Sequence, residues 1–156
     1  MTTDMDMRTR LASNLKEAMK NKEVERLSTL RLINAAIKDM DIAKRGDGDE
    51  QGVSDDDVLL ILGRMVKQRR ESARAYEEGG RLDLAERERA EIEVIEEFLP
   101  RQLSEPEVEA AISGAIAATG AESIRDMGKV MGALKARFTG QMDFGAVGPL
   151  VKDRLG

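Results

Sequence analysis

The stretch EEFLPRQLSEPEVEAAI, residues 96–112, marks where one helical region ends and another begins. Pro100 ends the first region, because the residue before a proline disfavours helical backbone angles. Ser104 followed three residues later by Glu107 is the pattern of a capping box, in which each side chain bonds the backbone N–H of the other residue. The two signals together predict two domains, residues 1–100 and residues 101–156.

Helical periodicity extends from this boundary in both directions. Apolar residues three and four positions apart predict four helices before it, marked within residues 7–18, 27–40, 58–76 and 85–99. The same spacing predicts three helices after it, within residues 108–116, 127–138 and 147–155. No segment alternates apolar and polar residues as a half-buried strand does. The chain is therefore predicted to be all-α, with two helical bundles of about four helices and then three.

Local signals predict how several of these helices begin and end. Gly79-Gly80 is expected to turn the third and fourth helices into a hairpin. Ser123 and Asp126 repeat the capping-box spacing before the sixth helix. In the last helix Pro149 lacks an N–H donor and would crowd the carbonyl of Gly145. The sequence therefore favours a second cap at Gly148, with Pro149 at the first helical position.

Composition excludes whole classes of chemistry. The chain has 156 residues with no His and no Cys, so it lacks the commonest general base, the commonest metal ligand and the thiol nucleophile. No catalytic residue, metal site or cofactor is expected. There is no apolar run of membrane-spanning length, and the first residues lack the pattern of a secretory signal. The expected location is the cytoplasm, with no membrane partner.

Charge is distributed unevenly along the chain. Overall there are 25 basic and 30 acidic residues, a net charge of −5. From Gly120 onward there are six basic and four acidic residues, which gives +2 and leaves −7 for the residues before it. An acidic protein is a poor non-specific binder of nucleic acid, so no DNA binding is expected. A small basic surface near the C-terminus can still contact phosphates.

The segment DMGKVMGALKARFTG, residues 126–140, is the strongest candidate for such a surface. Its apolar stripe predicts a helix, and two glycines one turn apart interrupt that helix where Ala would be more stable. Glycines on one face let another backbone come close, either an RNA backbone or a neighbouring helix of the same bundle. The RNA-binding candidates combine these glycines with nearby cations: Gly128, Lys129, Gly132, Lys135, Arg137 and Lys152.

A secondary basic face is predicted on the third helix. Lys67, Arg70 and Arg74 share one side of it and are suited to contact phosphates. The fourth helix is rich in Glu, and a hairpin at Gly79-Gly80 brings the two helices together. Pairing between these glutamates and the arginines of the third helix is the favoured interpretation.

The acidic loop GDGDEQGVSDDD, residues 46–57, resembles a calcium-binding loop in part. Carboxylate, amide and glycine residues occupy several of the required positions: Asp47, Asp49, Gln51, Gly52 and Asp55. Counted from Asp47 as the first position, the twelfth position is Val58, whereas a calcium loop has a bidentate Glu there. The alternative is a solvated loop in which Ser54 caps the third helix with Asp57 as its partner, and this is the prediction.

Several segments together resemble the GatB/YqeY family. They are LKEAMKNKEVERLSTLRLINAAIKD (15–39), KQRRES (67–72), EEFLPRQLS (96–104) and DMGKVMGAL (126–134). Stand-alone members of this family resemble the helical tail of the B subunit of the glutamine-dependent tRNA amidotransferase. The resemblance implies two helical bundles and contact with tRNA. It does not imply that this chain performs the chemistry of the amidotransferase. A family label of carbon–nitrogen ligase with glutamine as amido donor would therefore be inherited from the parent enzyme. Two features depart from the family pattern, the long acidic loop and Phe144-Gly145 after Asp143.

Three functional hypotheses follow from these observations. The leading one is a non-catalytic tRNA-binding or tRNA-enzyme accessory module. The second is an adaptor that binds an aminoacyl-tRNA synthetase or another protein without contacting RNA. The third is a subunit of an amidotransferase assembly.

Overall fold

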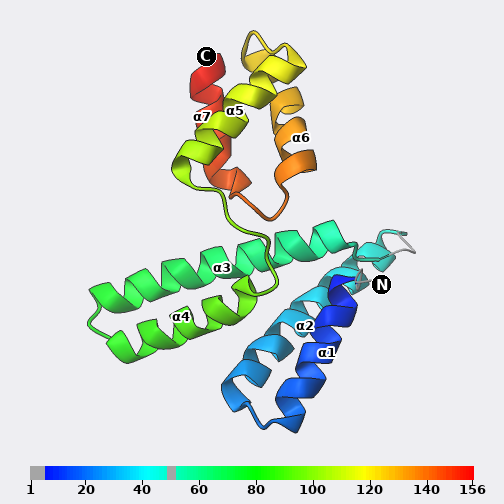
Figure 1. Ribbon diagram of the computed structural model, residues 1–156, viewed down its shortest axis with the longest axis vertical. Coiled ribbons are helices and arrows are strands. Elements are labelled where there is room, and N and C mark those ends of the chain that lie inside the picture. Colours follow the sequence, from blue (N-terminus) through cyan, green and yellow to red (C-terminus); the bar gives the residue numbers. More distant parts are fainter. Residues whose placement is uncertain (1–5, 49–51) are drawn as a thin grey trace. The chain divides into compact units, whose positions relative to one another are not determined.

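The computed structural model of this protein describes residues 6–48 and 52–156. Within these ranges there are seven α-helices, one short 3-10 helix and no strand, which confirms the all-α prediction (Figure 1). The elements are α1 (Met7–Lys20), α2 (Val24–Gly46), α3 (Asp55–Glu78), α4 (Leu82–Glu96), α5 (Glu105–Thr119), η1 (Ile124–Asp126), α6 (Met127–Phe138) and α7 (Phe144–Leu155). Of the helices described, none combines the length and the apolar character needed to cross a membrane.

The chain divides into two compact units, residues 1–99 and residues 100–156. The first unit contains α1–α4 and the second contains α5–α7. Each has its own apolar core, built from residues that recur at helical spacing, so each is described by itself.

In the first unit, α1 packs beside α2, and α3 with α4 forms a long antiparallel hairpin (Figure 1). The turn between α3 and α4 is the predicted Gly79-Gly80, where Gly80 adopts a φ of +75°. The core of this unit is aliphatic, with one Phe: Met7, Leu11, Ala18, Leu30, Ile33, Ile37, Val53, Val58, Ile61, Leu62, Met65, Val66, Ile92, Ile95 and Phe98.

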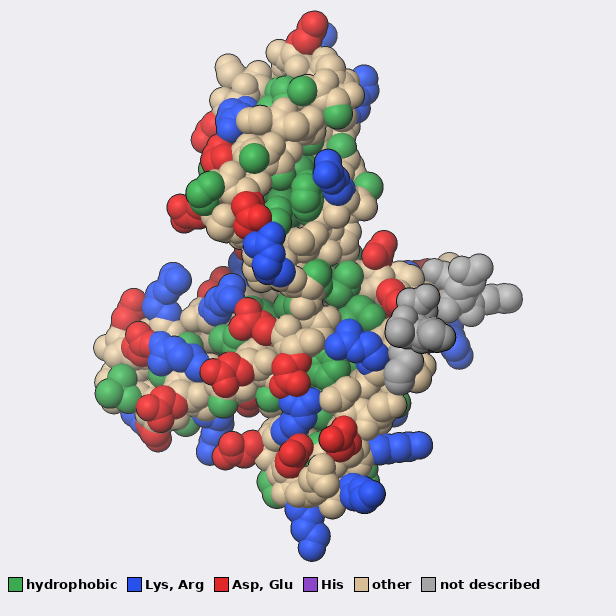
Figure 2. Space-filling view, in the orientation of Figure 1, with side chains coloured by type: hydrophobic (Ala, Val, Ile, Leu, Met, Phe, Trp, Pro, Cys, Tyr) green, Lys and Arg blue, Asp and Glu red, His purple; other side chains and the backbone are tan. Residues whose placement is uncertain are grey.

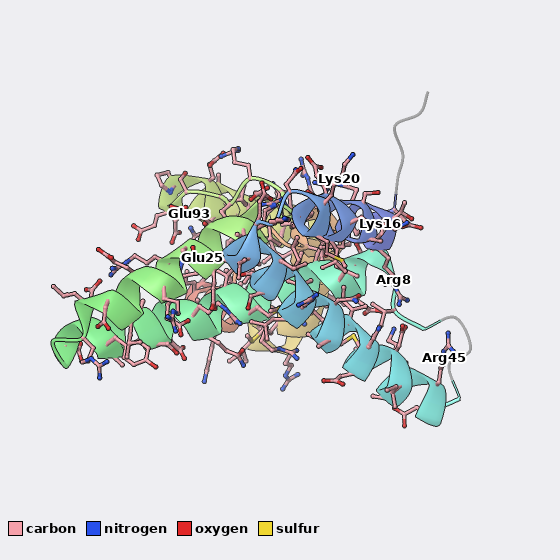
Figure 3. The ribbon with its side chains drawn as sticks, turned by 90° about the horizontal axis from the view of Figure 1, so that it is seen from below. Arg8, Lys16, Lys20, Glu25, Arg45 and Glu93 are labelled. Carbon is pink, nitrogen blue, oxygen red and sulfur yellow. The ribbon has the colours of Figure 1, made fainter. Side chains whose placement is uncertain are left out.

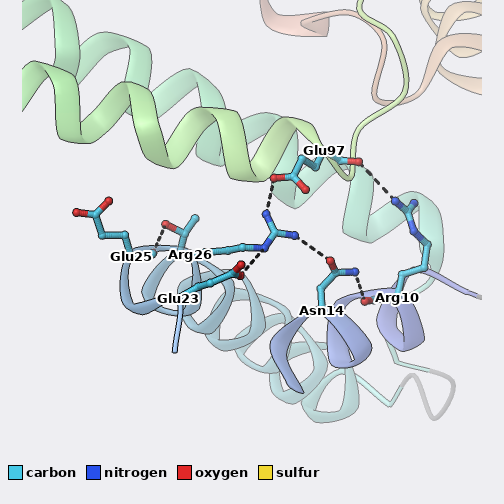
Figure 4. A network of polar contacts seen from close by, with 7 residues as sticks. Arg10, Asn14, Glu23, Glu25, Arg26 and Glu97 are labelled. Atoms are coloured by element: carbon cyan, nitrogen blue, oxygen red, sulfur yellow. Dashed lines mark hydrogen bonds and ion pairs between the residues drawn. The ribbon is translucent and has the colours of Figure 1, made fainter. Parts of the chain in front are cut away.

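A polar network joins the α1–α2 pair to the end of α4 (Figure 4). The Arg26 guanidinium donates to the Glu97 carboxylate at 2.5 Å and to Asn14 Oδ1 at 2.8 Å. Arg10 donates to the Glu97 carbonyl at 3.5 Å and lies 5.3 Å from the Phe98 ring centroid. The hydrogen bond to Glu97 raises the pKa of Arg26. These contacts fix the last turn of the first unit just before Pro100.

The end of the acidic loop is held at one carboxylate. Asp41 accepts from the Val53 backbone N–H at 3.0 Å and pairs with Arg8 at 2.7 Å. Gly52 has a φ of +72°, and a Cβ added there would lie 2.7 Å from Asp41 Oδ1. The backbone angle and the limited space beside Asp41 both favour glycine at this position. The capping box of Ser54 with Asp57 forms as predicted.

The second unit begins with the other predicted capping box. Ser104 and Glu107 bond reciprocally, and Arg101 holds the Glu107 carboxylate through two hydrogen bonds of 2.8 Å. The core residues of this unit come from all three helices and the loop before α7: Ile112, Ala115, Val130, Leu134, Met142, Val147 and Val151. Gly120 ends α5 at a φ of +67°, as expected.

Two local predictions for this unit are wrong. α7 is continuous through Pro149, so Gly148 is not a cap. Gly145 and Pro149 are both exposed, so the Gly145 carbonyl that loses a helical partner faces solvent while Val147 and Val151 anchor the other side. The Ser123–Asp126 spacing also does not form a capping box for α6. Ser123 instead begins η1, and Asp126 accepts from the Glu122 backbone N–H.

Candidate nucleic-acid interface

α6 has a buried face and an open face. Val130 and Leu134 are fully buried, which confirms that the apolar stripe of this helix faces the core. Gly128, Gly132 and Lys135 are exposed. At about 100° of rotation per residue, these three lie within a sector of about 60° on the solvent side. We call this sector, together with the exposed Lys129 beside it, the outer face of α6.

The two glycines of the outer face do not contact another helix. A Cβ built at Gly128 or at Gly132 meets no atom within 4 Å. The interpretation that they allow close packing against α5 or α7 is therefore wrong. Gly148 of α7 does lie near a neighbouring helix, since an added Cβ there would be 3.8 Å from Met127 Cε. The outer face thus has backbone exposed at two successive turns with open space in front of it.

The outer face carries cations with little competition from carboxylates. The Lys129 side chain is 72% exposed, and its ammonium is 4.0 Å from Asp126 Oδ1, at the limit of an ion pair. The Asp126 carboxylate accepts from the Glu122 backbone N–H, which lowers its pKa and keeps it charged. Lys135 is exposed one turn before the end of α6. Both lysines are able to reach an anion brought close to the glycines.

Arg137 does not belong to the outer face. It is rotated by about 160° from Lys135 around the helix, so the three cations predicted to form one basic surface are divided. Its guanidinium lies 5.3 Å from the Phe138 ring centroid, and it lines a groove between α5 and α6. Lys152 is exposed on α7, where its neighbour Arg154 pairs with Glu109 at 2.5 Å.

Arginines at and beside the secondary basic face of α3 form ion pairs with glutamates of α4. Arg70 pairs with Glu96 at 3.2 Å, and the adjacent Arg69 pairs with Glu91 at 2.8 Å. The favoured interpretation, pairing across the hairpin, is confirmed for these arginines. Lys67 and Arg74 are exposed on the same helix. Figure 2 shows blue and red side chains interspersed over the first unit, with no single-sign patch on the face in view.

The partial calcium loop cannot be assembled from the described residues alone. Asp49 and Gln51 lie outside them. Asp55 accepts from the Met7 backbone N–H at 3.3 Å, and the Gly52 carbonyl accepts from Lys44 at 3.4 Å. Over residues 6–48 and 52–156, no group of three or more potential ligands is placed to hold a metal ion.

A groove between α5 and α6 was not predicted. It has a volume of about 470 Å³. Its lining is mostly small and apolar: Leu103, Glu107, Ala110, Ala111, Gly114, Ala115, Ala118, Ala133, Leu134, Arg137 and Phe138. A signal was present in the sequence, because the exposed positions of α5 after its first turns carry only Ala, Ser and Gly.

Comparison with known proteins gives a consistent picture. The sequence model of the family described as Yqey-like protein matches residues 8–155. Altered inheritance of mitochondria protein 41, mitochondrial, from Lachancea thermotolerans is 33% identical over 112 residues, which are 70% of this chain and 57% of that protein. The protein of the same name from Clavispora lusitaniae is 38% identical over 89 residues, 57% of this chain and 49% of that protein. An uncharacterized protein of Schizosaccharomyces pombe is 28% identical over 94 residues, 60% of this chain and 72% of that protein.

These relatives bear on size and location as well as on family. The chain spans about half the length of the two relatives named for mitochondrial inheritance. Their names label them mitochondrial, whereas the sequence of this chain led us to expect the cytoplasm. Location in the cytoplasm therefore stays a prediction.

Proposed function

Because this chain belongs to the Yqey-like protein family, we propose that it is a non-catalytic tRNA-binding module that accompanies a tRNA-dependent enzyme. The binding surface is the outer face of α6. The observation that carries the proposal is the pair Gly128 and Gly132, exposed one turn apart with nothing within 4 Å of an added Cβ. The resemblance to the tail of the tRNA amidotransferase B subunit supplies the nucleic-acid class.

The energetics of these glycines support a function outside the fold. Gly132 lies in the interior of α6, where a glycine costs about 1 kcal/mol relative to Ala, and Gly128 is the second residue of the helix, where the cost is smaller. Neither position gains internal packing in return. A sugar–phosphate backbone approaching the bare helix would bring its phosphates within reach of Lys129 and Lys135. Such contacts set position and affinity and do not read bases, so the module would be tolerant of tRNA sequence.

The proposed role is binding and not catalysis. The chain resembles only the helical tail of the amidotransferase B subunit, so on this proposal the amidotransfer chemistry would have to come from a partner. On this proposal the partners are tRNA and an aminoacyl-tRNA synthetase or amidotransferase complex. The purified chain should not form Gln-tRNA from mischarged tRNA, glutamine and ATP.

Salt dependence of tRNA binding tests the proposal. We expect the Lys129→Ala, Lys135→Ala double variant to flatten the slope of log affinity against log salt by about one unit for each lysine–phosphate interaction removed. The matched control is Lys16→Ala, Lys20→Ala, which removes two exposed lysines from α1 of the first unit (Figure 3). Equal slopes in the two variants, or no tRNA binding by the parent chain at low salt, would favour an adaptor without RNA contact.

A bulky residue on the outer face gives a second test. Gly132→Leu places a side chain where a Cβ meets no atom within 4 Å, so the variant should fold. It should weaken tRNA binding at every salt concentration, because its bulk keeps the RNA backbone away. Full tRNA affinity in a folded Gly132→Leu variant would remove close approach from the proposal.

A further inference from the structure

We propose that the α5–α6 groove receives an amphipathic helix from a protein partner, which presents small or aliphatic side chains to α5 and a carboxylate to Arg137. This surface is separate from the outer face of α6, and the inference does not depend on tRNA binding. Its basis is the shape of the groove and the charge of Arg137, the groove residue that has no ion-pair partner among the described residues.

The shape of the groove suits a helix. Ala110, Gly114 and Ala118 recur every four residues along α5, so they line its floor over about 12 Å at 1.5 Å per residue. Ala133 and Phe138 of α6 form the opposite side. Small residues in such a row let a second helix pack at the short end of the usual 8–10 Å range of interaxial distance. A Cβ added at Gly114 meets nothing within 4 Å, so the floor is open.

The charge of the groove selects the partner's side chain. Glu107 is already held by Arg101 through two hydrogen bonds and accepts from the Ser104 backbone N–H at 2.9 Å. Arg137 forms no ion pair with any other residue of the described ranges, and stacking over Phe138 keeps its guanidinium beside the groove. The available charge is therefore positive, and a carboxylate beside it would form a charge-assisted hydrogen bond.

The same residues favour protein over RNA as the occupant. α5 carries Glu105, Glu107 and Glu109 and has no Lys or Arg. Arg137 is the single cation of the groove, so a phosphate chain along α5 would find one counter-charge and otherwise meet carboxylates and an apolar floor. An apolar helix stripe would bury Ala and Gly surface, and the groove-bound helix is an established mode of peptide recognition.

The test uses the full-length chain and a panel of designed helical peptides. Each peptide has 18 residues, an Ala and Leu stripe, a Gln-rich opposite face and one Glu whose position in the stripe is moved by one turn between panel members. Amide NMR shifts in the labelled chain report binding and its site. We expect at least one member to shift Ala110, Gly114, Ala118 and Ala133. A panel in which no member produces these shifts would overturn the proposal.

Two leucine variants separate the groove from the outer face of α6. Gly114→Leu should fill the groove, weaken peptide binding by about tenfold or more and leave tRNA binding unchanged. Gly132→Leu should leave peptide binding unchanged. If Gly114→Leu reduced tRNA binding as strongly as Gly132→Leu does, the groove would be part of an RNA surface and the proposal would be wrong. If tRNA does not bind at all, the peptide result still decides the inference.

A charge-exchange cycle tests the role of Arg137. Arg137→Gln in the chain or Glu→Gln in the peptide should each weaken binding by about threefold, and the two changes together by no more than either alone. Independent, additive effects would contradict the pairing. Sedimentation of the free chain addresses a second copy as occupant: a parent dimer that Gly114→Leu converts to a monomer would overturn the assignment to a different protein.

Discussion

The α3–α4 hairpin and the α5–α6 pair are both antiparallel, and they use their solvent faces in different ways. Across α3 and α4, arginines and glutamates pair with one another, as Arg69 does with Glu91 and Arg89 with Glu77. Among the described residues no ion pair joins α5 to α6. The exposed positions of α5 after its first turns hold Ala, Ser and Gly, and the exposed cations of α6 have no partner on α5. In the first pair, the charged side chains of one helix are neutralised by those of the other. In the second pair, helix backbone, the groove and several cations remain accessible to a binding partner, so both proposed binding surfaces lie in the second unit.

The largest expected effect tests whether the two units unfold separately. Leu134→Ala empties a fully buried position in the second unit and should cost about 3 kcal/mol. A unit as small as residues 100–156 has a small free energy of unfolding, so in this variant its folded-state NMR signals should disappear at a low denaturant concentration. Signals of Leu30 and Leu62 in the first unit should keep their parent midpoint. A single shared transition for all signals would erase the contrast between the units.

The next effect concerns the loop anchor of the first unit. Gly52→Ala combines a positive φ with a Cβ 2.7 Å from Asp41 Oδ1, so it should destabilise the unit by about 2 kcal/mol. Gly80→Ala is the matched control, since Gly80 has a φ of +75° and open space around it, and it should cost about 1 kcal/mol. Chemical denaturation measures both. An equal loss of unfolding free energy in the two variants would show that the close contact with Asp41 does not add to the cost of the positive φ.

The outer face of α6 should show a gain in stability. Gly132→Ala adds a methyl group in open space inside α6 and should stabilise the helix by about 1 kcal/mol, and Gly128→Ala, at the second residue of the helix, should give a smaller gain. Thermal unfolding of the second unit measures the gain. If either substitution destabilises the unit, that glycine has a structural role in the fold and its presence does not indicate an external partner.

The smallest effect concerns acid sensitivity. The Arg101 guanidinium first, and then the Ser104 backbone N–H, lower the pKa of Glu107 from 4.5 to about 2. Because the folded pKa is depressed, this carboxylate contributes stability that is complete above pH 4.5 and is lost as the pH falls toward 2. Glu107→Gln should therefore reduce the drop in melting temperature of the second unit over that range. Glu105→Gln, in the same first turn of α5, is the control and should retain the parent drop.

Sequence patterns predicted what depends on near neighbours in the chain. The boxes at Ser54 and Ser104 form because both partners lie within one turn, and Gly80 and Gly120 have the positive φ that a turn or helix end requires. The prediction at Pro149 failed because its outcome depends on which side of α7 is buried through Val147 and Val151.

The candidate surfaces depended on tertiary packing in the same way. Whether Gly128 and Gly132 face a helix or solvent is decided by where α5 and α7 lie, and no local pattern states it. The separation of Arg137 from Lys135 follows from helix geometry and was available from the sequence. The groove required two helices to be placed side by side, so only its small residues on α5 were visible beforehand.

The first residues of the second unit are hydrogen-bonded to the loop before α7. Gln102 donates to the Gly140 carbonyl at 2.5 Å, the Leu103 N–H to the Gln141 carbonyl at 2.9 Å, and the Gln141 side chain to the Arg101 carbonyl at 3.2 Å. These bonds hold the connecting segment against the loop before α7, and the Gln102 side chain also donates to the Pro100 carbonyl at 3.2 Å. We therefore expect that a gene fusion joining this unit after an unrelated helix would need to keep the residues from Pro100 onward. A fusion starting at Ser104 would lose these hydrogen bonds and the guanidinium that holds its first turn.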